Sequence, residues 1–204
     1  MKKYIKNIVP VAALLLTMGT ATSCVGDLDV TPINPNIQTG LNIDGLFNKC
    51  YANFALAGNG GANGDCDIDG IDGGTSGFVR QTFNANELPT DEAICGWGDD
   101  GIAGFCYNSY NATNPMLTGL YARITTGIAY CNQYLAEAGD QDATKLAEIR
   151  FLRAYEYFSL MDAWGNIPFT LQPLTKPERY TRAQTYEWLE KELLKIEPNL
   201  SEAK

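Results

Sequence analysis

Residues 114–139 read NPMLTGLYARITTGIAYCNQYLAEAG, and residues 142–164 read DATKLAEIRFLRAYEYFSLMDAW. Each stretch opens on a residue that caps helix N-termini, Asn114 or Asp142, and Pro115 suits the first helical position. Apolar residues then recur at helical spacing up to Gly139 and to Gly165, where glycine favours termination. Because only a short turn joins the two predicted helices, they are expected to pack as an antiparallel pair.

The predicted core faces of this pair can be read from the spacing. They are expected to carry Leu117, Leu120, Tyr121, Ile124, Ile128, Cys131 and Leu135 on the first helix, and Leu146, Ile149, Leu152, Phe158 and Met161 on the second. The second helix also holds Ala154 and, four residues later, Phe158, the small-then-large spacing of tetratricopeptide helix pairs. The fold class indicated is mostly α, with tetratricopeptide-like antiparallel helix pairs and long Gly/Asp-rich loops.

Two further helices are predicted on either side of this pair. One lies between Gly40 and Gly58, where apolar residues again recur at helical spacing. The other opens on a capping box formed by Thr181 and Gln184, turns its apolar residues toward the core and stops at Pro198. The core residues expected on this last helix are Leu189, Leu193 and Ile196. It resembles the first half of a second pair, so we expect its apolar face to be uncovered and the chain to be the N-terminal part of a longer protein.

Composition changes sharply in residues 58–104, which hold 12 of the 20 glycines. Glycine at this density predicts long loops between the helices. Long loops are commonly either functional or disordered. The interleaved apolar residues Phe78, Phe83, Leu88 and Trp97 favour a packed, functional loop.

Charge excludes several classes of function. The chain carries 24 Asp and Glu, 15 Lys and Arg and no His, for a net charge of -9. Nucleic acid is not an expected partner, because binding a phosphate backbone needs clustered positive charge. Without His, no Ser–His or Cys–His catalytic pair and no His-ligated metal can form within the chain.

The N-terminus predicts export. Lysines 2, 3 and 6 precede an apolar stretch at residues 8–18, which is too short to span a bilayer. Small residues then lead to Cys24, which favours a lipoprotein signal with an acylated Cys24, although Ala21 stands where such signals usually carry Leu. The alternative is an ordinary signal peptide that leaves Cys24 free. We expect residues 1–23 to be the signal peptide, 24–39 a lipidated tether and 40–204 the helical domain.

Five cysteines follow Cys24, and no C-x-x-C spacing occurs among them. An odd number leaves at least one thiol unpaired in the monomer. We therefore expect zero to two disulfides, no metal-thiolate chemistry and no cofactor.

Two acidic stretches invite a chemical interpretation. Asp65, Asp67, Asp69 and Gly70 are spaced like the opening of a calcium loop, but the twelfth position, which should be Glu, is Ser76. The alternative is a solvated acidic turn. Residues 86–92, NELPTDE, contain several carboxylates, but neighbours in sequence cannot flank a glycosidic bond as a glycosidase requires. A capping turn at Thr90 is the simpler interpretation of that stretch.

Two basic residues, Arg150 and Arg153, lie in the middle of a helix that is otherwise core. They could form a phosphate clamp. A structural role is favoured, in which they pair with acids such as Glu148 and Glu156 or with carbonyl groups.

Trp97 stands among glycines and acids in residues 95–101, CGWGDDG. A flat ring exposed beside carboxylates suits sugar binding, because the apolar face of a pyranose stacks on the ring while charged groups bond its hydroxyls. The alternative is a Trp that folds back to anchor the loop.

Five stretches in order along the chain resemble one family, the SusD/RagB-like outer-membrane glycan-binding lipoproteins of starch-utilisation-type systems. They are residues 23–32 (SCVGDLDVTP), 70–77 (GIDGGTSG), 78–80 with 86–92 (FVR and NELPTDE), 148–154 (EIRFLRA) and 164–169 (WGNIPF). The resemblance implies an α-helical fold with tetratricopeptide-like pairs that support glycan-binding loops. It also implies a non-enzymatic, lipid-anchored and surface-exposed protein that captures oligosaccharide beside a TonB-dependent transporter and delivers it to that transporter. The lipid would be the only membrane contact.

The resemblance to the starch-binding founding member is strongest from Asp72 to Asp100. Carried over by position, Asp72 and Arg80 would bond sugar hydroxyls and Trp97 would form part of an aromatic arc along an α-glucan such as starch or maltooligosaccharide. Asp100 would take the place of an Asn, and Cys95 that of a second aromatic. The missing ring keeps a second hypothesis open, a scaffold that binds only the transporter and whose glycan site has decayed or differs. An enzyme is a third hypothesis, disfavoured by the lack of His and of spaced carboxylates.

Overall fold

A computed structural model of the chain describes residues 41–58, 66–139 and 142–201. The described elements belong to one compact unit, Asn42–Lys204. The predicted signal peptide and tether, together with Cys24 and Asp65, lie outside the described residues.

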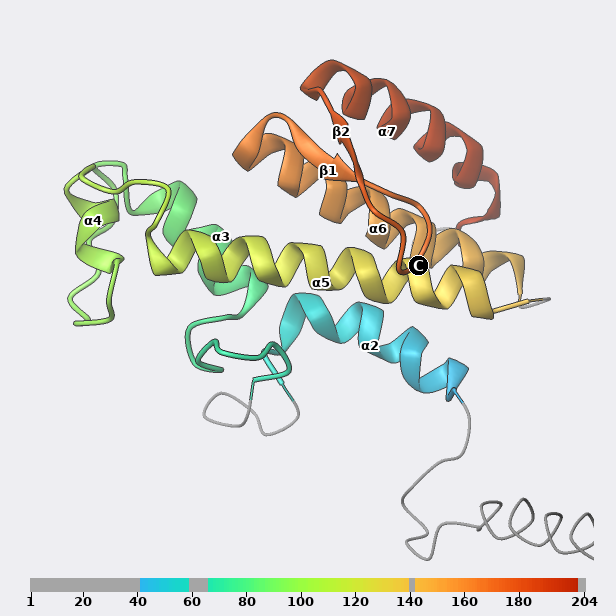
Figure 1. The fold of residues 1–204 in the computed structure, drawn as a ribbon, viewed down its shortest axis with the longest axis horizontal. Helices are drawn as coiled ribbons and strands as arrows, with labels where there is room; N and C mark the ends of the chain where they lie inside the picture. The colour runs from blue at the N-terminus through green and yellow to red at the C-terminus, as the bar shows by residue number, and fades with distance from the viewer. Residues whose placement is uncertain (1–40, 59–65, 140–141, 202–204) are drawn as a thin grey trace, which may run out of the picture. The chain divides into compact units, whose positions relative to one another are not determined.

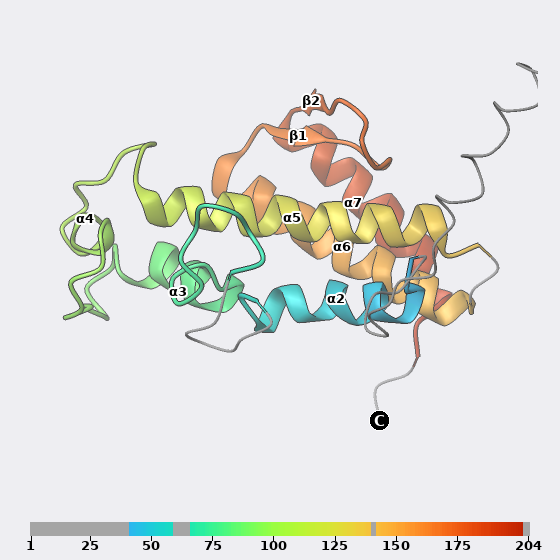
Figure 2. The ribbon, with the colours of Figure 1, turned by 60° about the horizontal axis from the view of Figure 1, so that its bottom comes forward.

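The unit is mostly helical, as predicted. In chain order its elements are α2 (Ile43–Ala55), α3 (Phe78–Glu87), α4 (Ile102–Cys106), α5 (Pro115–Glu137), α6 (Ala143–Trp164), β1 (Ile167–Phe169), β2 (Glu178–Tyr180), α7 (Arg182–Ile196) and the 3-10 turn η2 (Glu197–Asn199). Helix α2 packs on α5, and α7 packs on α6 (Figure 1). Helices α3 and α4 lie near the end of α5 that begins at Pro115 (Figure 2).

The helix boundaries predicted from capping residues are confirmed. The side chains of Asn114 and Asp142 accept hydrogen bonds from the N–H groups of Met116 and Thr144, at 2.9 and 2.8 Å. The capping box of Thr181 with Gln184 is complete. Gly139 and Gly165 have φ values of +56° and +75°, a region that suits glycine because it has no Cβ. The short turn at Gly139 joins α5 to α6, and the two helices pack against each other as the predicted antiparallel pair. The tetratricopeptide-like arrangement stays a prediction.

Three apolar clusters form the core of the unit. The largest joins α5, α6 and α7 around buried residues such as Ile124, Leu160 and Leu189. A second, with Cys50 and Ile149, joins α2 to the α5–α6 pair. The third, with Leu88, Ile102 and Phe105, holds α3 and α4 against the start of α5. This third cluster also supports the loop that contains Trp97, because Cys95 of that loop packs against it.

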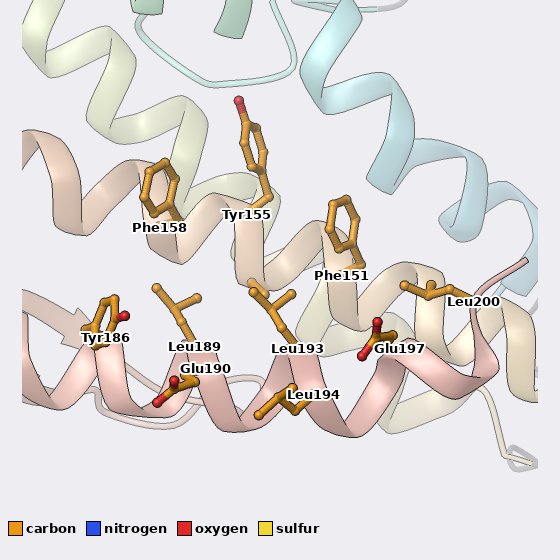
Figure 3. Close-up of a pocket in the computed structure, with 11 residues that line it drawn as sticks. Phe151, Tyr155, Phe158, Tyr186, Leu189, Glu190, Leu193, Leu194, Glu197 and Leu200 are labelled. Carbon is orange, nitrogen blue, oxygen red and sulfur yellow. The ribbon is translucent and has the colours of Figure 1, made fainter. Parts of the chain in front are cut away.

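Three sequence expectations about the fold are wrong in part. Residues 58–104 are not only loop, since α3 forms within them and α4 begins at Ile102. A short antiparallel hairpin of β1 and β2 follows Gly165, where no strand was predicted, and it is stabilised by the stacking of Phe169 on Tyr180. Three residues expected in the core are exposed instead: Tyr121 by 37%, Phe158 by 48% and Leu193 by 39%. Phe158 and Leu193 line an apolar pocket between α6 and α7 (Figure 3).

Candidate functional site

Arg80 lies in the first turn of α3 and connects two loops. Its Nη1 donates to the carbonyl oxygen of Gly74, and its Nη2 donates to Oδ2 of Asp99 at 2.6 Å. Both members of the Arg80–Asp99 ion pair are about one-third exposed, so the pair lies at the surface with one side in solvent.

Trp97 lies on the loop of residues 95–101, named the Trp97 loop below. The residue is 73% exposed. The Cζ atom of Arg80 lies 5.8 Å from the ring centroid, within the range of a cation–π contact. The hypothesis that Trp97 folds back as a loop anchor is therefore wrong, and the ring offers an open face.

Asp72 and Asp100 are close in sequence to residues that Arg80 holds. Asp72 comes two residues before Gly74, which Arg80 holds, and Asp100 directly follows Asp99. Both residues are exposed, and neither carboxylate bonds to another described residue. The structure therefore brings Arg80 and Trp97 into contact and adds Asp99, whereas Asp72 and Asp100 are joined to this cluster only through neighbouring residues of the chain.

The loop before α3 is fixed by a buried group named here the Arg123 cluster. Arg123, on α5, is fully buried, and its guanidinium donates to the carbonyl oxygens of Ser76 and Ala57 at 2.9 and 3.0 Å. It also donates to Oδ1 of Asn53 at 3.2 Å and pairs with Asp67 at 2.8 Å. One buried cation thus holds Ala57 and Ser76, the residues on either side of the Gly-rich segment 58–75, against α5.

The Trp97 loop has its own anchor at the start of α5. Asn114 caps α5 with its side-chain oxygen, while its Nδ2 donates to the carbonyl oxygen of Gly101 at 2.9 Å. Gly101 has a φ of +88°, and a Cβ there would lie 2.7 Å from the Asn114 oxygen. Glycine at this position lets the loop approach the cap and places Asp99 within reach of Arg80.

The acidic stretch interpreted as a possible calcium loop serves a structural purpose in its described part. Asp67 pairs with Lys49 at 2.6 Å as well as with Arg123. Burial acts to raise the pKa of Asp67, but the hydrogen bonds and charges of Lys49 and Arg123 outweigh it and lower that pKa. Ser76, at the position expected for a calcium-binding Glu, is buried beside Arg123. Among the described residues, no group of three or more acidic, Cys or His side chains is arranged to hold a metal ion.

The remaining sequence hypotheses also have structural outcomes. Arg150 forms two hydrogen bonds to Glu192, at 2.7 and 2.6 Å, and Arg153 bonds Asn132 at 2.9 Å. Their structural role is confirmed, but the acidic partner is Glu192 on α7 rather than Glu148 or Glu156. The turn at Thr90 is confirmed by its bonds to Glu87 and Glu92.

All five cysteines in the described part are thiols. Hydrogen bonding to Cys50 and burial together raise the pKa of Cys131 well above its usual value. Within the described ranges, the helices are too short or too polar to cross a membrane.

Two important residues were missed in the sequence, Asp99 and Arg123. Asp99 stands beside Trp97, but sequence alone does not say which of two adjacent carboxylates turns toward Arg80. Arg123 left a clearer signal, because it lies among the apolar residues of a predicted core face. A cation there indicates a buried acidic or carbonyl partner.

Comparison with known proteins shows what the chain is similar to. The chain is 37% identical over 208 residues to the starch-binding protein SusD of Bacteroides thetaiotaomicron. The match covers 98% of this chain and 37% of SusD, so the chain spans little more than a third of that relative's length. No family model matches the chain.

Solved structures share the fold. A laminarin-binding SusD-like protein aligns with a TM-score of 0.57 at 20% identity, over 80% of this chain and 35% of its own. Surface glycan-binding protein A from Bacteroides fluxus aligns with a TM-score of 0.54 at 22% identity, over 77% and 32% of the two chains. A SusD superfamily protein from Bacteroides vulgatus gives 0.58 at 13%, over 79% and 35%. The predicted resemblance to SusD-like proteins is thus confirmed, over 37% of the length of the curated relative.

Proposed function

We propose that the chain binds a glycan on the surface formed by Trp97, the Arg80–Asp99 pair and the carboxylates of Asp72 and Asp100. The observation that carries the proposal is the exposed ring of Trp97 with a guanidinium 5.8 Å from its centroid. A pyranose would stack on the open ring face, while the charged groups beside it exchange hydrogen bonds with the hydroxyls.

Arg80 has N–H donors left for hydrogen bonds to a ligand. Arg80 uses two of its nitrogens to hold Gly74 and Asp99, and a guanidinium carries five N–H donors. Each sugar hydroxyl that replaces a water bond contributes about 0.5–1.5 kcal/mol net, more where the partner is charged. Binding by one ring and a few polar groups is therefore weak for each site, and the shape of the glycan decides specificity.

An α-glucan of the starch or maltooligosaccharide type is the proposed ligand. Its support is the sequence relation to a protein named for starch binding, together with the position-by-position resemblance between Asp72 and Asp100. Non-catalytic binding agrees with the printed names of the relatives, which describe binding proteins.

Cellular placement is part of the same proposal. Acylation of Cys24 would tether the chain to the outer membrane, with the lipid as its membrane contact. The bound glycan would then pass to a TonB-dependent transporter. The N-terminal sequence and the family resemblance support this arrangement.

Retention on immobilised starch tests the site. Trp97→Ala should abolish retention, because it removes the stacking surface. Ile94→Ala is the matched control, since Ile94 lies just before the Trp97 loop and is 76% exposed, close to the exposure of Trp97. Retention of Trp97→Ala as strong as that of the wild type would reject the site.

A second candidate function is a transporter-associated scaffold with a decayed or different glycan site. The position of Cys95 favours it, because this residue packs partly buried against the cluster of Leu88 and Phe105 and presents no ring. Calorimetry with a panel of glycans separates the two candidates. Silence for every glycan together with intact transporter binding would support the scaffold.

A further inference from the structure

Two cysteines meet where α2 packs on α5 (Figure 2). Cys50 on α2 and Cys131 on α5 are each 1% exposed and belong to the second apolar cluster. Hydrogen bonding to Cys50 is the largest cause of the raised pKa of Cys131, so the two thiol groups lie in contact. Neither residue takes part in the glycan site proposed above.

Contacts on both sides of this pair show how the two helices are aligned. On one side the ring centroids of Phe47 and Tyr134 lie 5.6 Å apart. On the other side a Cβ on Gly127 would overlap Nδ2 of Asn53. The cysteines lie between these two contacts, three residues from each along α2 and three or four residues along α5. The helices therefore run antiparallel, and the two cysteines stand opposite each other.

The same contacts show that the helices approach closely. A disulfide needs Cα atoms about 4.4–6.8 Å apart, a separation that neighbouring helices reach only where small side chains let them come together. Gly127 provides such a position one turn from Cys131, because the Asn53 side chain fills the space that a Cβ would take.

The other three cysteines lie in different parts of the unit. Cys66 contacts the hydroxyl of Ser76 at 3.1 Å, next to the Arg123 cluster. Cys95 and Cys106 pack against the third apolar cluster. The core thus brings one specific pair together from the five thiols.

We propose that Cys50 and Cys131 form a disulfide that joins α2 to α5 and stabilises their packing when the chain folds in an oxidising compartment. Each thiol gives up one proton and one electron as the sulfur–sulfur bond forms. A disulfide oxidant, such as an oxidised oxidoreductase or oxidised glutathione, takes up the two electrons and two protons and becomes two thiols.

Burial decides when this bond forms and how long it lasts. An oxidant reaches both thiols only while the chain is folding, before α2 and α5 cover them. Once formed, the disulfide is shielded from attacking thiolates by the same burial. The oxidising compartment rests on the export proposed above, whereas the choice of these two cysteines rests on the packing of α2 and α5.

Peptide mapping tests the proposal on the chain itself. The chain is unfolded in urea and refolded with oxidised and reduced glutathione, its free thiols are blocked with N-ethylmaleimide in urea, and it is digested with trypsin. Cleavage after Lys and Arg leaves Cys131 as the one cysteine of residues 124–145 and places Cys50 with Cys66 in residues 50–80. We expect these two peptides to be joined in the wild type and in the matched control Cys66→Ser, and to be separate in Cys50→Ser.

Thermal unfolding gives a second measurement of the same bond. A disulfide between positions this far apart in sequence constrains the unfolded chain strongly. The wild type refolded with glutathione should unfold about 5 °C or more above the wild type refolded in reductant, and Cys66→Ser should show the same difference. Cys131→Ser should unfold at the same temperature after either treatment.

Three outcomes would overturn the proposal. The first is a refolded wild type in which Cys50 and Cys131 both carry N-ethylmaleimide. The second is loss of the joined peptides in Cys66→Ser, which would assign the bond to Cys66. The third is a wild type whose unfolding midpoint is the same after both treatments. Neither measurement depends on glycan binding or on export, so failure of the function proposed above would leave these results unchanged.

Discussion

Replacement of Arg123 by Met removes the buried cation that holds the Gly-rich segment to α5. Met keeps much of the length of the side chain but has no N–H donor. The substitution leaves the carbonyl oxygens of Ser76 and Ala57 and the side-chain oxygen of Asn53 without their donor in a buried site. It also breaks a 2.8 Å ion pair with Asp67.

The magnitude follows from the burial of the two partners. Removing one member of a buried ion pair costs about 3–5 kcal/mol of unfolding free energy. Asp67 keeps its second cation, Lys49, at 2.6 Å, so the expected loss is at the lower end, about 3 kcal/mol. Lys49→Met breaks the other pair of the same carboxylate, but Lys49 is 26% exposed, and such pairs contribute about 1 kcal/mol or less.

Urea unfolding of the two variants measures this difference. With a slope of about 1–3 kcal/mol per molar urea, Arg123→Met should lower the midpoint by about 1–3 M, and Lys49→Met by about one third of that or less. The slope itself should stay unchanged. Equal midpoint shifts for the two variants, or a shift below about 0.3 M for Arg123→Met, would refute the anchoring role of Arg123.

Three further predictions concern the buried polar groups and the close helix contact. Burial raises the pKa of Glu156 well above its usual value despite the hydrogen bond from Asn53. The unfolding free energy of the wild type should therefore fall as pH rises above about 5. Glu156→Gln should remove this dependence of unfolding free energy on pH. For Glu192, burial acts to raise the pKa, but the hydrogen bonds to Arg150 and the charges of Arg150 and Arg153 outweigh it and lower that pKa. The stability that the Glu192 carboxylate contributes is therefore present at neutral pH and is lost as pH falls below about 4. Glu192→Gln should reduce the dependence of unfolding free energy on pH on the acid side and lower the unfolding midpoint at pH 7. A Cβ on Gly127 would overlap Oε1 of Glu156, so Gly127→Ala should lower the free energy of unfolding by about 1–3 kcal/mol. In the same helix, a Cβ on Gly119 meets no atom within 4 Å, so Gly119→Ala should be neutral or stabilising. Calorimetry that finds Gly119→Ala to be the less stable variant would contradict the packing.

The four long helices could be predicted from sequence because each combines apolar periodicity with capping residues. Helix α3 was missed because Gly77, the residue before its first turn, provides no side-chain cap, and because polar residues such as Gln81 and Asn84 lie on its buried side. Apolar periodicity identifies the apolar face of a helix, but it does not say what covers that face. That is why Phe158 and Leu193 were expected in the core and are exposed.

The candidate site was predictable as a set of residues, though not as an arrangement. Composition around Trp97 suggested a ring among charges, and the structure adds that the ring is exposed and lies near Arg80. The contact with Asp99 depends on Gly101 and on the second hydrogen bond of Asn114. These are long-range contacts between loops, and local sequence patterns carry no information about them.

The indole N–H signals of the three tryptophans give the most direct measurement of glycan binding at the proposed site. They are recorded by nuclear magnetic resonance during titration with maltoheptaose, and the signal of Trp97 is assigned by its disappearance in Trp97→Phe. Stacking of the sugar on the exposed ring predicts that the Trp97 signal shifts progressively to saturation, while the signal of Trp188, which packs between Tyr157 and Phe169, stays in place. A Trp97 signal that does not move at saturating glycan, or a shift confined to Trp188, would contradict glycan binding at this site.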